Sequence, residues 1–227
     1  MIKKDTTFPV LDKGFIIFKD SLGGDQSIVD AARVSYQKGT KKKNTDAKLI
    51  HYLIKNRHTS PLEMCEIMVQ VKAPIIVARQ WFRHRMAEYN EMSLRYSEAP
   101  DEFYRPAEWR MQHATNKQAS GGIITDPDII EECYADLEVV QDMAMKSYKN
   151  MIKNGVAREE ARMVLPTNLY TTWYFKANLR SMSNFVGLRD HDGAQYEIRE
   201  YAKVLKTIIK EVAPVAYEAM EEHLWAS

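Results

Sequence analysis

The sequence predicts a single α+β domain in which helices predominate and strands are few. Three observations lead to this class. Apolar residues recur at three- or four-residue spacing along most of the chain, strict alternation is confined to one short segment, and no internal repeat is present. A length of 227 residues falls between one and two domains, and we interpret residues 1–227 as one domain.

Four elements are expected in the first third of the chain. A short helix is predicted over 27–36, and a second helix runs from its N-cap, Thr45, to about Asn56. Residues 65–71 alternate between apolar and polar side chains, which predicts a half-buried strand. Pro74 suits the first turn of the helix that follows this strand.

The second part of the chain begins with a polar connection. Residues 97–126 are rich in Pro, Gly, Ser, Asn and Asp and predict an exposed loop. Asp126 then opens the longest helix, which Gly155 ends, and Cys133 and Val140 are expected on its buried face. Further helical, amphipathic segments are expected over 158–164, 171–186, 194–212 and 214–224.

Charge and cysteine content exclude several protein classes. Lys and Arg number 32 against 31 Asp and Glu, so a formal charge of +1 draws the protein to neither nucleic acid nor acidic lipid, and any anion site is local. Cys65 and Cys133 are too few for a disulfide framework, and both are expected to be core residues rather than nucleophiles. No stretch approaches the roughly 18 apolar residues of a membrane span, so we expect a cytoplasmic protein without a membrane partner.

The segment 83–96 holds the densest set of directional hydrogen-bonding groups. It contains three arginines, a histidine, two carboxylates, an amide, a hydroxyl and two phenols. Guanidinium groups bind phosphate, amides and hydroxyls bind ring edges, and aromatic rings stack, so a planar polyanion fits this inventory. Glu91, Ser93 and Arg95 are expected to project to one side of an extended segment, where one nucleotide monophosphate would use all three.

The same segment resembles the signature of the flavin-dependent thymidylate synthases. That signature has Arg-His-Arg, two residues, Ser, one residue, Asn, two residues, Ser, one residue, and Arg or Lys. Every fixed position matches except Glu88, which replaces the first Ser and is expected to lower the local positive potential or to pair with an arginine. The resemblance also includes the element at 58–63, and Gly193 departs from it where relatives carry His.

The resemblance implies two sets of binding residues and one catalytic residue. Deoxyuridine monophosphate would contact Gln80, Trp81, Phe82, Arg83, Glu91, Met92, Ser93, Leu94, Arg95, Arg162 and Arg189. FAD would contact Ser60, Arg83, His84, Arg85, Glu91, Asn178, Leu179, Arg180 and Asn184. Arg189 is the expected catalytic residue, because a guanidinium beside the pyrimidine stabilises an ionised ring nitrogen and enriches the carbon that is methylated.

The family resemblance also implies a reaction and an assembly. FAD would be the bound cofactor, with methylenetetrahydrofolate and NADPH as co-substrates in the reductive methylation of deoxyuridine monophosphate to thymidine monophosphate. The fold would contain a small antiparallel sheet, and the protein would be a homotetramer whose active sites are shared between subunits.

Two alternatives belong to other classes of protein. A nucleic-acid-binding module would use the same arginines and aromatic residues, but the near-neutral charge counts against it, and no nucleic-acid partner is expected. A metal-dependent hydrolase would use His51, His58, His84 and His191. Their separations along the chain form no metal-ligand motif, so no metal is expected.

Overall fold

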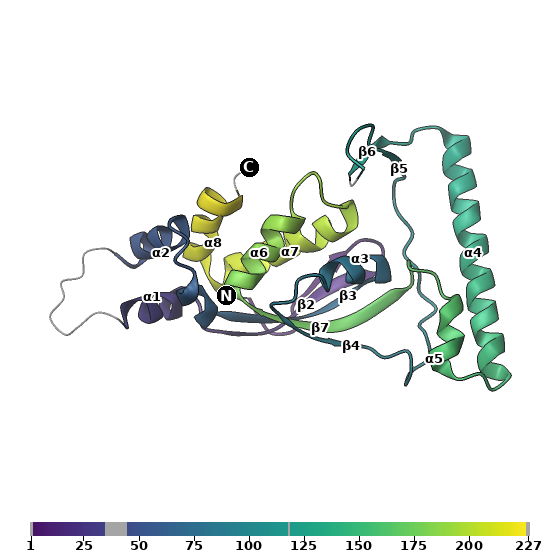
Figure 1. Cartoon of the computed structure of the whole chain (residues 1–227), viewed down its shortest axis with the longest axis horizontal. Coiled ribbons are helices and arrows are strands. Elements are labelled where there is room, and N and C mark those ends of the chain that lie inside the picture. Colours follow the sequence, from purple (N-terminus) through teal and green to yellow (C-terminus); the bar gives the residue numbers. More distant parts are fainter. Residues whose placement is uncertain (1, 35–44, 118, 226–227) are drawn as a thin grey trace.

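A central antiparallel sheet organises the structure, a computed structural model that describes residues 2–34, 45–117 and 119–225. Its five strands lie in the order β1-β2-β3-β7-β4, and helices cover one of its faces (Figure 1). The α+β class and the small antiparallel sheet are confirmed. The strands are β1 (Thr7–Val10), β2 (Gly14–Leu22), β3 (Glu66–Pro74), β4 (Glu88–Glu91) and β7 (Tyr170–Asn178).

One main core fills the space between the sheet and its helices. Trp81 packs at its centre, with ring centroids 5.3 Å from Trp173 and 4.5 Å from Phe185. These three side chains come from a helix, a strand and a second helix, so the core joins the layers directly. The helices that lie on the sheet are α3 (Ile75–Trp81), α6 (Leu179–Arg189) and α7 (Tyr196–Val212), and α1 (Asp25–Arg33), α2 (Asp46–Lys55) and α8 (Pro214–Met220) pack together towards one end of it (Figure 1).

Several local predictions are confirmed. The Thr45 side chain accepts a hydrogen bond from the Lys48 amide and so caps α2. The predicted strand over 65–71 is β3, and Pro74 lies at the junction between β3 and α3. The helix expected over 27–36 is α1, although its last two expected positions fall outside the described residues.

The prediction of one amphipathic segment over 171–186 is wrong. Its first half is β7, which pairs with β3 on one side and β4 on the other. Trp173, Phe175 and Ala177 alternate inward at strand spacing. The pattern changes at Asn178, whose side chain accepts a hydrogen bond of 2.9 Å from the Ser181 amide and begins α6.

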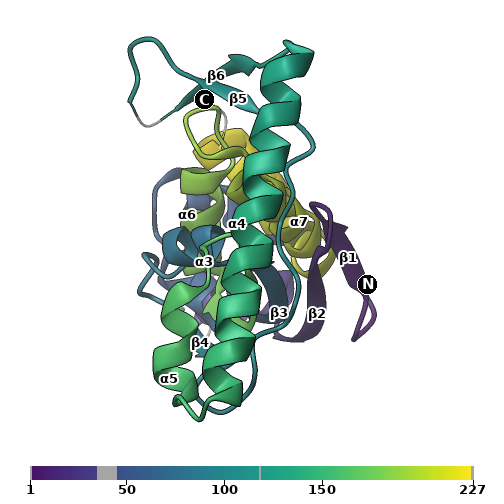
Figure 2. The same ribbon diagram turned by 90° about the vertical axis from the view of Figure 1, so that its right-hand side faces the viewer.

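A second, smaller core holds α4 (Pro127–Lys153) and α5 (Arg158–Ala161) beside the sheet domain (Figure 2). It contains Phe103, Met145, Tyr148, Ala161 and Leu169. The long helix begins at its predicted cap, Asp126, but its apolar stripe is not buried along its whole length. Cys133 is partly exposed and Val140 is 53% exposed, because the contacts that this half of α4 makes, such as the hydrogen bond from the Tyr134 hydroxyl to the Pro106 carbonyl, involve other positions of the helix.

The segment 97–126 is also more ordered than predicted. It contains the small hairpin of β5 (Arg110–Gln112) and β6 (Ser120–Ile123). At the other end of the chain, α8 passes into a π-helical turn, Glu221–Trp225, so the last predicted helix is present with a changed final turn. No helix among the described residues is both long and apolar enough to cross a membrane.

Candidate functional site

The arginine-rich segment begins where α3 ends. The backbone amide of His84 donates to the carbonyl of Trp81 at 3.0 Å, and the Tyr89 hydroxyl donates to the His84 carbonyl at 2.5 Å. Since Trp81 is fully buried, this end of the helix is fixed to the core. Arg83 and Arg85 therefore follow a rigid support and lie in exposed, irregular chain.

Three predicted site residues meet between α3 and α6. Arg189 is the last residue of α6, and its Nε donates to Nε2 of His84 at 3.1 Å. Its Nη2 donates to the backbone carbonyl of Gln80 at 3.2 Å. The imidazole of His84 also packs against Phe185, with ring centroids 4.6 Å apart. These contacts fix the orientation of the guanidinium from two directions.

The electrostatics of this cluster leave the charge of Arg189 without a counter-ion. Burial, aided by the nearby guanidinium, lowers the pKa of His84 to about 4, so its imidazole is neutral near pH 7 and accepts the hydrogen bond. Burial also lowers the pKa of Arg189 from its ordinary value of 12.5, and the group remains a cation. Among the described residues no carboxylate pairs with Arg189, so its positive charge is available to an anionic ligand.

The pKa of His84 predicts sensitivity to acid. An unfolded histidine titrates near pH 6.5 and the folded one near 4, so the unfolded state binds more protons in this interval. Stability should therefore be complete above about pH 6.5 and fall as the pH drops towards 4. Allowing for partial exposure, we expect wild type to lose about 1–2 kcal/mol more than His84→Gln between about pH 7 and 4.5. Urea unfolding measures the difference, and equal losses would contradict the assignment.

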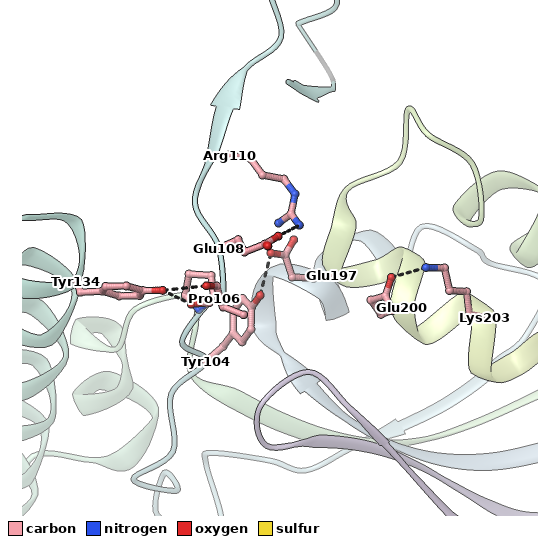
Figure 3. Close-up of polar contacts among 9 residues, drawn as sticks. Tyr104, Pro106, Glu108, Arg110, Tyr134, Glu197, Glu200 and Lys203 are labelled. Carbon is pink, nitrogen blue, oxygen red and sulfur yellow. Dashed lines mark hydrogen bonds and ion pairs between the residues drawn. The ribbon is translucent and has the colours of Figure 1, made fainter. Parts of the chain in front are cut away.

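A partly buried chain of polar side chains, which the sequence did not predict, holds the side chain of Gln80. The Gln80 amide donates to the side-chain oxygen of Gln195, and Gln195 donates to Oε2 of Glu197 at 2.8 Å. The Tyr104 hydroxyl donates to Oε1 of Glu197 at 3.1 Å (Figure 3). Glu197 is buried on the inner face of α7. An acidic residue on an otherwise apolar helix face was the available sequence signal, because a buried carboxylate needs partners.

A second group of predicted residues meets at Glu159. Nε of Arg95 donates to a carboxylate oxygen of Glu159 at 2.8 Å, and Nε of Arg162 donates to its backbone carbonyl at 3.3 Å. Both arginines are exposed. Two residues expected to bind the nucleotide are thus brought together from segments far apart in sequence. An exposed ion pair such as that of Arg95 is worth about 0–1 kcal/mol, so a phosphate can replace the carboxylate at low cost.

The prediction that Glu91, Ser93 and Arg95 share one extended segment is wrong. The strand β4 ends at Glu91, whose carboxylate accepts a hydrogen bond of 2.8 Å from the Thr171 hydroxyl. The chain then turns, and the Ser93 hydroxyl accepts from the amide of Arg95 at 3.2 Å. Ser93 and Arg95 therefore follow the strand in a turn and do not continue it.

The residues expected to bind FAD lie around the start of α6. Asn178 caps this helix, and Arg180 in its first turn pairs with Glu63 at 2.6 Å. Ser60 is exposed and begins the 3-10 turn that carries Glu63. Asn184 is exposed on the next turn of α6. The structure therefore joins the upstream element at 58–63 to the downstream residues of the same predicted set.

The free side chains of this region fit a flavin dinucleotide. Among the described residues, Arg83, Arg85 and Asn184 form no side-chain hydrogen bond or ion pair and are exposed. Unpaired guanidinium groups are suited to the diphosphate of such a cofactor. Trp81 and Leu179 have fully buried side chains, so these two residues can offer a ligand only backbone atoms. Phe82, Met92 and Leu94 are partly buried.

Glu88 does not pair with an arginine of the motif. It lies opposite Lys176 in the sheet, and their charged groups are 3.8 Å apart. We expect Glu88→Ser, which restores the family residue, to keep the fold and activity, because this exposed pair contributes at most about 1 kcal/mol. Initial rates and flavin content measure the effect. A folded but inactive variant would show that the site depends on the carboxylate.

Neither cysteine resembles an activated nucleophile. Burial raises the pKa of the Cys65 thiol to about 12, so it stays protonated at neutral pH. Cys133 lies on α4 and is partly exposed. A covalent thiolate mechanism therefore has no support in the geometry of either residue.

Comparison with known proteins gives one consistent result. A sequence model of the family described as thymidylate synthase complementing protein matches residues 17–215. A flavin-dependent thymidylate synthase from Thermus thermophilus is 53% identical over 218 residues, which make up 96% of this chain and 79% of that protein. Another from Anaplasma marginale is 46% identical over 220 residues, or 96% of this chain and 76% of that protein.

Solved structures agree with the sequence matches. A crystal structure of a UMP/dUMP methylase, PolB from Streptomyces cacaoi bound with 5-Br UMP, has a TM-score of 0.85 and 30% identity. The match covers 94% of this chain and 96% of that one. Among the described residues, His51, His58, His84 and His191 do not come together in one cluster. Signature, fold and comparisons together show that this chain belongs to the flavin-dependent thymidylate synthase family.

Proposed function

We propose that this chain converts deoxyuridine monophosphate to thymidine monophosphate, with methylenetetrahydrofolate as carbon donor and NADPH as reductant. FAD, when bound, supplies the hydride chemistry. The observation that carries the proposal is the Arg189 guanidinium, which is partly desolvated and held by His84 and the Gln80 carbonyl. Family members are flavin-dependent, and this cluster supplies the electrostatic part of such a reaction from the protein itself.

Arg189 would act on the pyrimidine ring. Its neighbours are neutral acceptors, so its charge is not cancelled before substrate binds. A fixed cation in a partly water-excluded site stabilises negative charge on a ring nitrogen more strongly than a mobile solvated one. The anionic ring is richer in electrons at the carbon to be methylated. Gln80, whose side chain is held by Gln195, would bind a ring edge.

The remaining predicted residues would bind the two ligands away from the reacting carbon. Arg95 and Arg162, together with Ser93, would hold the nucleotide phosphate, because phosphate suits guanidinium and hydroxyl donors. The FAD set would be Ser60, Arg83, His84, Arg85, Glu91, Asn178, Leu179, Arg180 and Asn184. Phosphate binding would release Arg95 from its exposed pair with Glu159.

We further propose a cytoplasmic homotetramer with shared active sites. One face of α4 exposes apolar side chains, among them Val139 at 60% and Met143 at 65%. Such a patch on a long helix is typical of a subunit interface. In addition, α5, next to Arg162, lies well apart from α6, which carries Arg189, in both Figures 1 and 2. Residues from a second subunit would bring both groups to one nucleotide.

The variant Arg95→Ala tests the assignment of the phosphate site. Loss of a charge-assisted contact should weaken nucleotide affinity by about 1.5–3 kcal/mol, or roughly 10- to 150-fold, while flavin content is retained. Calorimetric titration with deoxyuridine monophosphate and the flavin absorbance of the same sample measure both quantities.

A matched control removes an exposed cation elsewhere. Lys149 pairs with Asp101 at 2.7 Å and belongs to neither predicted set, so Lys149→Ala should bind the nucleotide like wild type. If Arg95→Ala loses its flavin and keeps its nucleotide affinity, the two ligands have been assigned to the wrong sets.

A further inference from the structure

Three side chains of types that commonly bind metal ions come together outside the proposed active site. His51 comes from α2, whereas Glu222 and His223 come from the π-helical turn at the end of the described chain. The two oxygens of the Glu222 carboxylate lie 3.4 Å from Nδ1 of His51 and 3.7 Å from Nε2 of His223. The two imidazole rings meet edge to face, with centroids 5.6 Å apart. One donor atom from each residue lies within 4.8 Å of the others.

We propose that His51, Glu222 and His223 bind a divalent transition-metal ion, for which Zn²⁺ is the best fit. Two neutral imidazoles and one carboxylate are a standard zinc donor set. A tetrahedral ion with bonds of about 2.0–2.2 Å needs donor atoms about 3.3–3.6 Å apart, which modest side-chain rotations achieve from the observed separations. Glu222 is 63% exposed, so water can reach the fourth position.

The backbone that carries two of the ligands is already anchored without the metal. The indole Nε1 of Trp225 donates to the carbonyl of Ser183 in α6 at 3.1 Å. Lys206 bridges Glu221 at 2.7 Å and Asp190 at 3.1 Å. These contacts hold the π-helical turn against α6 and α7, so binding does not require the segment to be ordered first, and little of the binding free energy is lost.

A bound ion would add a metal cross-link where α2 already packs against α8 and the π-helical turn. His51 and Glu222 are distant in sequence, so the link would join two segments far apart along the chain. The ion would join α2 to the end of the chain and thereby stabilise both. None of the three ligands belongs to the nucleotide or flavin set, so the site stands independently of the proposed function. Spacing along the sequence gives no sign of it, since the ligands come from opposite ends of the chain.

Titration with Zn²⁺ alone tests the site. Untagged, flavin-loaded protein is first treated with a chelator and dialysed, and calorimetry should then show one strong Zn²⁺ site per chain. The double variant His51→Gln, His223→Gln should weaken this binding at least about tenfold. Loss of a metal ligand should reduce the affinity at least as much as loss of a residue that only hydrogen-bonds to a ligand. The control His58→Gln removes an exposed histidine whose ring lies edge to face with Tyr52, and should bind like wild type.

Hydrogen exchange locates the ion without any variant. Zn²⁺ should slow amide exchange in α2 and in Glu221–Trp225 and should raise the midpoint of thermal unfolding. Co²⁺ in place of Zn²⁺ should give the intense visible absorption of a tetrahedral site. The proposal is overturned if Zn²⁺ does not bind, if the double variant binds it as tightly as wild type, or if protection appears only in other segments.

Discussion

The variant Arg189→Ala is expected to turn over about 30- to 900-fold more slowly than wild type, a loss of about 2–4 kcal/mol of transition-state stabilisation. The guanidinium is oriented before substrate arrives, by His84 at 3.1 Å and by the Gln80 carbonyl at 3.2 Å. Its interaction should strengthen as negative charge develops on the pyrimidine. Turnover should therefore fall more than nucleotide affinity, which single-turnover rates and equilibrium titration measure separately.

A variant at another arginine controls for a general loss of charge. Arg105 is exposed, pairs with Glu138 and belongs to neither predicted set, so Arg105→Ala should keep the wild-type rate. Wild-type turnover in folded, flavin-loaded Arg189→Ala would remove this residue from the mechanism.

The largest effect on stability is expected from Trp81→Ala, about 3–5 kcal/mol of unfolding free energy. The indole is fully buried and packs against Trp173, Phe175 and Phe185 with ring centroids 4.5–5.4 Å away. Its removal leaves a cavity in the core beneath the arginine-rich segment. The midpoint of urea unfolding should fall while the denaturant dependence stays unchanged.

An exposed aromatic residue provides the comparison for this core variant. Tyr96 is 80% exposed, so Tyr96→Ala should change stability by no more than about 0.5 kcal/mol. A loss of less than about 1 kcal/mol in Trp81→Ala would show that the site does not depend on this packing.

The sequence predicted where helices begin, because helix-capping residues are a local signal. Thr45 and Asp126 accept hydrogen bonds from the first turns of α2 and α4, as their residue types indicated. Burial was harder to predict, because the apolar stripe of α4 gives no indication of what lies against it. In 171–186 two periodicities share one window, strand spacing up to Asn178 and helix spacing after it. The first half of this window is a strand because β7 pairs with β3 and β4, a tertiary interaction that the local sequence does not show.

The sequence predicted which residues belong to the site, but not how these residues are arranged. The family resemblance identified His84 and Arg189, yet their hydrogen bond depends on how α3 and α6 cross the core. Gln195 and Glu197 were missed because they reach Gln80 only through folding, from more than a hundred residues away in sequence. The turn after Glu91 was missed because the alternation of residue types continues beyond the end of β4.

Product analysis tests the central claim most directly. Purified protein is incubated with deoxyuridine monophosphate, methylenetetrahydrofolate, FAD and NADPH, and nucleotides are separated by chromatography. We predict that thymidine monophosphate forms, that omission of NADPH or removal of the flavin abolishes it, and that Arg189→Ala forms it much more slowly. The account is contradicted if no thymidine monophosphate appears with flavin-loaded wild-type protein, or if its formation needs neither flavin nor NADPH.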